Sequence, residues 1–204
     1  MNLPFSQACE NNKDAILEVL LTEFSNSKHV LEIGSGTGQH ACYFSKEMPF
    51  LTWQCSDLLV NHDVLNSRID LARQKNLFRP ISLDLQKPWQ LEHLKAEQKH
   101  IDAIFTANTL HIMRWQLVIN FFAGAAMHLP VNGILAIYGP FNYQGQFTSE
   151  SNAEFNAWLK ARDNDSGIRD FEAIEQLAKN SKLTLINDYA MPANNRLLVF
   201  KKVR

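Results

Sequence analysis

The segment VLEIGSGTGQHACYF, residues 30–44, constrains the fold of this chain more than any other part of the sequence. Its first four residues are an apolar run typical of a buried strand, and the residues from Gln39 onward have helical spacing. Between them stand three glycines on alternate positions, Gly34, Gly36 and Gly38. Glycine allows positive φ and lets a ligand approach the backbone closely. A glycine-rich turn that leads from a strand into a helix therefore predicts a nucleotide-like ligand beside the open N–H groups of the helix.

Strand and helix patterns alternate over about the first two-thirds of the chain. Apolar runs predict strands at 29–33, 51–56, 80–83, 101–106 and 133–138; helical spacing predicts helices at 12–24, 39–46, 64–72 and 115–129. This alternation predicts a doubly wound α/β fold with a parallel sheet covered on both faces. The last two strands, 183–188 and 197–200, are joined by a connection too short for a crossover helix. They therefore predict an antiparallel hairpin that ends a mostly parallel, seven-stranded sheet.

Composition bounds the class of protein. The chain has 204 residues, 46% of them hydrophobic and 20% charged, which suits one globular domain over residues 1–204. A net charge of −1 lacks the basic excess of a protein that follows a nucleic-acid backbone. The N-terminus has no signal-peptide pattern, and the most apolar stretch, 117–131, is too short to span a bilayer. Three cysteines without CxxC spacing predict reduced thiols and no metal site. We expect a cytoplasmic protein with no membrane or DNA partner.

The spacing of the glycines separates the possible ligands. A dinucleotide site needs G-x-G-x-x-G, and Gln39 stands where its third glycine belongs; no P-loop lysine follows either. The pattern is instead acidic-x-G-x-G-x-G, with Glu32 as the acid. Asp57 and Asp84 end the second and third predicted strands. Asp57 also suits the ribose-binding acid of an NAD fold, so by itself it leaves both cofactors open.

This pattern resembles the first motif of class I S-adenosylmethionine-dependent methyltransferases. The resemblance implies a Rossmann-like fold, S-adenosylmethionine as cofactor, and Asp57 and Asp84 facing its ribose and adenine. The cofactor-binding residues that it implies are Glu32, Gly34, Ser35, Gly36, Gly38, Asp57, Asp84, Leu85 and Asn108. The structural alternatives are a plain turn for the glycines, a helix N-cap for Asp57 and a turn start for Asp84.

The whole chain also resembles a domain-of-unknown-function family of methyltransferase-like proteins that includes methyltransferase-like 26. The matching segments are PFSQACENNK (4–13), LEIGSGTGQHACYF (31–44), LTWQCSD (51–57), ANTLHI (107–112), YGPFNYQGQFTSESNAEFNAWLKARD (138–163) and MPANNRLLVF (191–200). Cys55 and Arg114 stand where the family pattern leads us to expect proline. The resemblance implies a fold and a cofactor, and it names no substrate.

His111 is the candidate catalytic base, because it follows the fourth strand and imidazole has an ordinary pKa of about 6.5. Its alternative is a histidine packed in a helix-entry loop. Asn108 precedes it and is a candidate contact for the methionine part of the cofactor. The Asn-Pro-Pro-Tyr motif of amino-methylating nucleic-acid enzymes is absent there, which argues against a DNA amine as substrate.

Residues from about 139 to 169 form a polar and aromatic connection that we interpret as a lid or substrate insertion. A capping box that starts at Ser151 predicts a helix at 153–161 within it. The candidate substrate contacts are Asn142, Tyr143, Arg162 and Arg169. A lid with only internal hydrogen bonds is the equal alternative. Asn194 and Asn195 suit the turn of the last hairpin. Asn12 and Lys13 are placed to close the cofactor site, although Lys13 also reads as a solvated charge.

The function predicted from these residues is in-line methyl transfer from S-adenosylmethionine to an acceptor. We expect a small molecule, and the sequence leaves a protein or an RNA open as the alternative acceptor. Such a reaction needs alignment above all, and it needs a base only when the nucleophile still carries its proton. Two alternatives stay open: a non-catalytic S-adenosylmethionine-binding module that acts through a partner, and an enzyme that uses another nucleotide cofactor, including a nicotinamide oxidoreductase. The sequence leaves the oligomeric state open.

Overall fold

The computed structural model of the chain describes residues 3–91, 94 and 100–204. The chain divides into two compact units, Met1–Thr106 and Ala107–Arg204. The single domain expected over residues 1–204 stays a prediction. Among the described helices, none is long and apolar enough to cross a membrane.

The described strands form a seven-stranded sheet in the order β3-β2-β1-β4-β5-β9-β8. In the first unit, β1 (His29–Ile33) pairs in parallel with β2 (Thr52–Asp57) and β4 (Ala103–Ala107), and β2 pairs in parallel with β3 (Leu77–Ser82). In the second unit, β9 (Asn195–Lys202) runs antiparallel to both β5 (Ile134–Gly139) and β8 (Leu183–Met191). The predicted α/β fold, a mostly parallel sheet that ends in an antiparallel hairpin, is confirmed.

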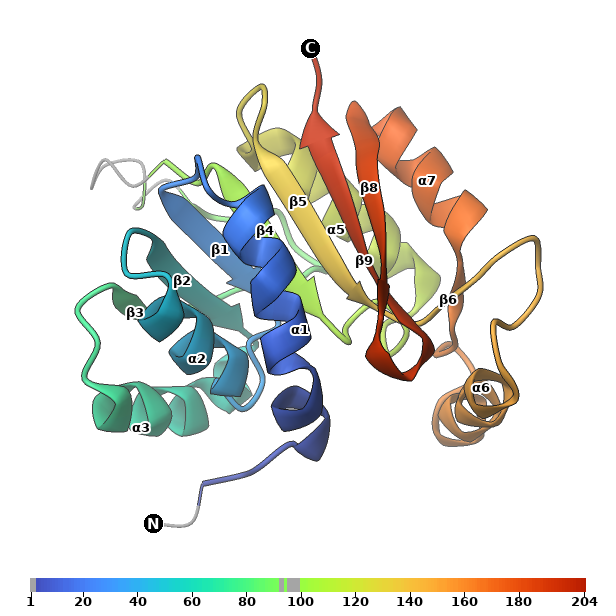
Figure 1. The fold of residues 1–204 in the computed structure, drawn as a ribbon, viewed down its shortest axis with the longest axis horizontal. Coiled ribbons are helices and arrows are strands. Elements are labelled where there is room, and N and C mark those ends of the chain that lie inside the picture. The colour runs from blue at the N-terminus through green and yellow to red at the C-terminus, as the bar shows by residue number, and fades with distance from the viewer. Residues whose placement is uncertain (1–2, 92–93, 95–99) are drawn as a thin grey trace. The chain divides into compact units, whose positions relative to one another are not determined.

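The helices of the first unit are α1 (Gln7–Glu23), α2 (Gln39–Glu47) and α3 (His62–Ala72), and α1 packs beside α2 (Figure 1). Helix α1 begins five residues before the predicted position, because the Ser6 side chain accepts a hydrogen bond from the Cys9 N–H at 3.3 Å and caps it. Under α2 lies an aromatic core in which the Phe44, Trp53 and Phe105 rings are 5.5–5.8 Å apart.

The helices of the second unit are α5 (Trp115–His128), α6 (Glu150–Arg162) and α7 (Phe171–Asn180), and α7 runs along β8 (Figure 1). Two short strands, β6 (Phe141–Asn142) and β7 (Arg169–Asp170), pair in parallel. They bring the two ends of the predicted insertion, residues 139–169, against each other.

Two local predictions were wrong. The predicted capping box at Ser151 is not the start of α6: Ser149 is the N-cap, and its Oγ accepts the Asn152 N–H at 3.1 Å. Ser149 has an extended backbone, with φ of −162° and ψ of 160°, so the helix begins at the next residue, Glu150. The third strand begins three residues before Pro80, because β3 is an edge strand of the sheet, where proline costs no ladder bond.

Candidate functional site

The glycine loop follows β1 and takes the conformation that its spacing predicts. Gly34, Gly36 and Gly38 have φ of 71°, 55° and 76°, all in the left-handed region. A Cβ at Gly38 would also lie 3.0 Å from a methyl carbon of Leu65 on α3, so this position excludes a side chain for two reasons. The loop therefore presents backbone to a ligand and leads directly into the N-terminus of α2, where Gly38 is the N-cap.

Hydrogen bonds anchor this loop to the end of β2. The N–H groups of Gly34 and Ser35 both donate to the Ser56 carbonyl, at 3.1 and 3.0 Å. The Ser56 N–H donates to the Ser35 hydroxyl at 3.2 Å, and the Ser56 hydroxyl donates to the Glu32 carbonyl at 2.6 Å. The ends of two parallel strands are thereby held together, and the predicted cofactor residues Ser35 and Gly34 serve as the connection.

Asp57, the last residue of β2, has its carboxylate directed at the glycine loop. Oδ2 accepts the Gly36 N–H at 2.7 Å, and Oδ1 accepts the Leu58 N–H and the Asn61 amide, each at 2.7 Å. The residue is 9% exposed. Because a carboxylate offers about four acceptor positions, Asp57 has capacity for a further donor or can exchange one that it holds.

Glu32 lies beneath the loop and is 3% exposed. Burial raises the pKa of Glu32 to about 7, although hydrogen bonds from Trp53 and Ser35 oppose this and the charge of Asp57 adds to it. The Trp53 indole N–H donates to Glu32 Oε2 at 3.1 Å. Glu32 therefore takes part in the site as a buried acid that supports the loop.

Asp84 lies two residues after the end of β3, in a turn. Its Oδ1 accepts the Gln86 N–H at 2.9 Å, and its carbonyl accepts the Lys87 N–H at 2.9 Å. These contacts match the structural alternative for Asp84. Leu85 beside it is 9% exposed. The cofactor contact of both residues stays a prediction.

Gln39 and Arg68, which the sequence analysis did not select as site residues, connect the glycine loop and the helices beside it to the segment that precedes α1. The Gln39 amide accepts the Ser6 N–H at 2.6 Å and donates to the Ser6 carbonyl at 3.2 Å. Arg68 on α3 donates to the carbonyls of Thr37 and Pro4, each at 2.5 Å. The signal in the sequence was Gln39 itself, which replaces a glycine of the dinucleotide motif.

Asn12 and Lys13 have partners inside the first unit. Asn12 is 5% exposed and its Oδ1 lies 2.7 Å from Nε2 of His40, a residue that stacks on Phe44. Burial lowers the pKa of His40 to about 4. Lys13 forms an ion pair with Glu10 and lies over the Tyr43 ring. The predicted closing of the cofactor site by Asn12 and Lys13 stays a prediction.

Asn108 and His111 belong to the second unit. Asn108 has a left-handed φ of 58°, and its N–H donates to the Tyr138 carbonyl at 2.9 Å. His111 is 5% exposed and packs edge-on against Phe155. Burial, and then the charge of Arg169, lower the pKa of His111 to about 4. The catalytic role of His111 stays a prediction, and a pKa this low makes the imidazole a weak base at neutral pH.

The four candidate substrate residues differ in what they contact. Arg169 donates to the carbonyls of Leu110, Met113 and Asp165, so its guanidinium holds the helix-entry loop in place. Arg162 is exposed and lies over the Trp158 ring at 4.5 Å. Asn142 is 8% exposed, and its Oδ1 has no hydrogen-bond partner within the described residues. An orphaned buried acceptor of this kind is one that a ligand can satisfy.

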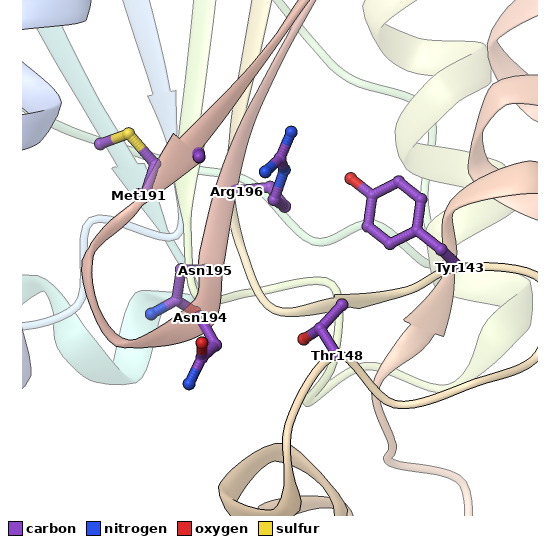
Figure 2. A pocket seen from close by; sticks show the side chains of 7 residues that line it. Tyr143, Thr148, Met191, Asn194, Asn195 and Arg196 are labelled. Atoms are coloured by element: carbon purple, nitrogen blue, oxygen red, sulfur yellow. The ribbon is translucent and has the colours of Figure 1, made fainter.

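Tyr143 lines a pocket that belongs wholly to the second unit (Figure 2). The residues that line it are Tyr143, Thr148, Ala190, Met191, Asn194, Asn195 and Arg196. Asn194 has the left-handed φ of 56° that a turn asparagine suits. The turn that carries Asn194 and Asn195 also forms a wall of the pocket.

The described residues include no group of three or more histidine, cysteine or acidic side chains placed to hold a metal ion. The three cysteines are unpaired thiols, and burial raises the pKa of Cys42 to about 11.

A family model described as "Protein of unknown function (DUF938)" matches residues 3–202. The chain belongs to the DUF938 family. Its match over nearly the full length agrees with segments of resemblance that run from residue 4 to residue 200 of the sequence.

Solved methyltransferases share the fold of this DUF938 protein. An O-methyltransferase family protein from Burkholderia thailandensis has a TM-score of 0.77 at 17% identity over 94% of this chain and 56% of its own. An O-methyltransferase family 2 protein from Planctomyces limnophilus DSM 3776, in complex with apigenin, has a TM-score of 0.77 at 16% identity, over 95% of this chain and 57% of its own. PigF with SAH has a TM-score of 0.73 at 14% identity, over 88% of this chain and 52% of its own. The chain thus spans just over half the length of these proteins, and the likeness at this identity shows the fold.

Proposed function

We propose that this DUF938 protein is an S-adenosylmethionine-dependent methyltransferase that acts on a small-molecule acceptor. The observation that supports the proposal most is the pairing of the glycine loop with Asp57. Three left-handed glycines expose backbone at the end of β1, and the carboxylate at the end of β2 is directed at them at 2.7 Å. A ligand that combines an amino-acid part with a ribose matches this combination of donors and acceptor.

The residues present fit that cofactor. Gly36 has open space at its Cβ position, where the nearest contact is the Gly34 carbonyl at 4.0 Å. The loop would hold the amino-acid end, Asp57 the ribose hydroxyls, and Asp84 and Leu85 the adenine. The bound sulfonium supplies an electrophilic methyl group and a neutral leaving group. The task of the chain is to orient the acceptor, which accounts for ~7–11 kcal/mol of a barrier in well-aligned reactions.

The nicotinamide alternative is disfavoured by the contacts of Gln39. A dinucleotide site needs a glycine there so that helix and strand pack closely. In this protein the position carries a long amide whose two hydrogen bonds to Ser6 join α1 to the start of α2. Gln39, the residue that distinguishes the two cofactor motifs, therefore has a structural role in this protein.

A non-catalytic S-adenosylmethionine-binding module is the second candidate. The observation that favours it is the burial of His111, which is 5% exposed: burial lowers its pKa to about 4 and leaves the predicted base weak at neutral pH. An acceptor that is already deprotonated, or a thiolate, needs no such base. The two candidates therefore differ in whether any acceptor receives the methyl group.

Calorimetric titration tests the cofactor. We expect S-adenosylmethionine and its demethylated product to bind and NAD⁺ not to bind. Asp57→Asn should weaken S-adenosylmethionine binding by about 10- to 100-fold, the value of one charged hydrogen bond. Asp63→Asn, the same change at an exposed position of α3, is the matched control. Uptake of NAD⁺ without uptake of S-adenosylmethionine would overturn the proposal.

A labelled methyl donor tests the reaction. Incubation with extracted metabolites and, separately, with extracted proteins should place the label in a small molecule. Tight cofactor binding with no labelled product in either extract would select the non-catalytic module. Label in the protein extract alone would contradict a small-molecule acceptor.

A further inference from the structure

The pocket of the second unit has the size of a ligand site, and none of the residues that line it is a predicted cofactor residue. Its volume is about 400 Å³, at the small end of the ~300–1,000 Å³ typical of small-molecule sites. One wall is the turn between β8 and β9, with Met191, Asn194 and Asn195 (Figure 2). Tyr143 and Thr148, from the segment between β6 and α6, lie across from it (Figure 2).

Arg196 gives this pocket its electrostatic character. It is the one charged residue among the seven that line the cavity. Asp188, which is not part of the lining, accepts from Nε through its Oδ1 at 2.7 Å and from Nη2 through its backbone carbonyl at 3.0 Å. A guanidinium has five N–H donors; the two contacts with Asp188 use two of them, and a side-chain hydrogen bond to Tyr143 uses a third. The wall therefore presents the remaining N–H donors of Arg196, whose charge is paired with that of Asp188.

Tyr143 is fixed beside Arg196. Its hydroxyl donates to Asp188 Oδ2 at 2.8 Å, its ring stacks on Phe171 with centroids 4.9 Å apart, and Arg196 lies 5.7 Å from the ring centre. Figure 2 shows the hydroxyl of Tyr143 directed toward Arg196. Burial and the contact with Asp188 raise the pKa of Tyr143, so the phenol stays protonated. Its proton goes to Asp188 and its oxygen accepts from Arg196, which leaves one further lone pair of that oxygen for a ligand.

The two walls are joined by Asn152, a buried residue of α6. Its amide donates to the Thr148 hydroxyl at 2.9 Å and to the Asn194 carbonyl at 3.1 Å. At the turn, Ala193 and Asn194 have φ of 55° and 56° in succession. A left-handed alanine is a strained conformation, and such strain persists where the surroundings require one geometry, often at a binding site. The pocket is thus held open in a defined shape.

We propose that this pocket binds a small organic acid that carries a hydroxyl group, with the carboxylate on Arg196 and the hydroxyl on the Tyr143 oxygen. The inference concerns this pocket alone and stands apart from the proposed function. An acid matches the pocket because the carboxylate and guanidinium groups pair in a fixed, planar geometry. The polar side chains of Thr148, Asn194 and Asn195 complete a hydrogen-bonding rim suited to a second polar group.

The test is a titration of the full chain with 4-hydroxybenzoate in the absence of cofactor, followed by the backbone amide signals. We expect saturable binding, with the signals of Thr148 and of residues 194–196 moving most. The neutral analogue 4-hydroxybenzamide should bind at least about tenfold more weakly, because it loses the charge-assisted contact. Arg196→Gln should remove that difference.

Further variants separate a binding role from a folding role. Thr148→Val, on the opposite wall, removes one neutral hydrogen bond to the ligand and also the acceptor of the Asn152 amide. It should weaken binding about threefold to tenfold, and its free energy of unfolding, measured beside the affinity, separates the two losses. Lys160→Gln on the exposed face of α6 removes one charge outside the pocket and should leave the affinity unchanged. If the acid does not bind, or binds equally to wild type and to a folded Arg196→Gln, the inference is overturned. S-adenosylmethionine uptake without acid binding contradicts this inference alone, whereas acid binding without S-adenosylmethionine uptake contradicts the proposed function alone.

Discussion

Ala193 is the residue whose backbone conformation agrees least with its side chain. With φ of 55° and ψ of 40° it lies in the left-handed region, which costs a residue with a Cβ ~1–2 kcal/mol. Glycine avoids this cost but loses ~0.5–1 kcal/mol of chain entropy on folding. We therefore expect Ala193→Gly to stabilise the protein by about 0.5–1 kcal/mol, measured by urea unfolding.

The matched control is Ala190→Gly, three residues earlier in β8, where the backbone is extended. Glycine in a strand gains nothing from positive φ, so this change should destabilise the protein by about 0.5–1 kcal/mol. A destabilisation of similar size at both positions would show that the left-handed alanine is not strained.

For single residues, the sequence predicts the backbone conformation better than it predicts the contacts of the side chain. The alternate glycines predict positive φ because only glycine adopts it without a steric cost, and all three have it. The orphaned Oδ1 of Asn142 could not be predicted, since it depends on which donors the folded chain brings near it. Ser149 replaces Ser151 as a cap for a related reason: both serines suit the position by type, and only the folded backbone, which is extended at Ser149, distinguishes them.

At the level of elements, the start of α1 is tied to the start of α2 by the side chain of Gln39. Gln39→Ala removes two hydrogen bonds to the Ser6 backbone, each with a net value of ~0.5–1.5 kcal/mol. We expect a loss of about 1–3 kcal/mol in the free energy of unfolding, together with faster amide exchange at Ser6, whose N–H loses its acceptor.

Gln7→Ala provides the comparison, because Gln7 is exposed and its amide bonds only to Asn11 within the described residues. It should change the free energy of unfolding by less than about 0.5 kcal/mol. Equal effects of the two substitutions, or an unchanged exchange rate at Ser6 in Gln39→Ala, would contradict the role given to Gln39.

Periodic elements could be predicted from the sequence, and short ones could not. Helix α5 and the hairpin of β8 and β9 follow from apolar spacing and from a connection too short for a crossover. Strands β6 and β7 have two residues each, which is too few for any period to be visible. Their pairing joins residues 28 positions apart and arises only in the folded chain.

For the whole molecule, the fold class follows from the alternation of strands and helices, which the sheet confirms. The spacing of the glycines narrows the choice of cofactor, because this spacing is visible in a short stretch of sequence. The polar pocket of the second unit could not be predicted, since Tyr143 and Arg196 meet across 53 positions of sequence through their shared partner Asp188.

The stability of the chain should depend on pH through three buried groups. The pKa of His40 and of His111 is lowered to about 4, so both stay neutral in the folded state while they become charged in the unfolded one. Their contribution is present above pH 6.5 and is lost as the pH falls from 6.5 to about 4. Glu32, with its pKa raised to about 7, acts in the opposite direction: its contribution is lost as the pH rises from 4.5 to about 7.

The two effects combine differently in the two units. In Met1–Thr106 the pH-dependent contributions of Glu32 and His40 to the free energy of unfolding have opposite signs and largely cancel. In Ala107–Arg204 no other residue with a shifted pKa in this range offsets the contribution of His111. Near pH 5.5 the unfolded chain therefore binds about one more proton than the folded chain. The free energy of unfolding should then fall by roughly 1.4 kcal/mol for each unit by which the pH is lowered. Urea unfolding between pH 7 and pH 5 measures this slope. His111→Asn should flatten it toward zero, and Glu32→Gln should steepen it toward roughly twice that value; a slope that neither substitution changes would show that these groups titrate normally in the folded chain.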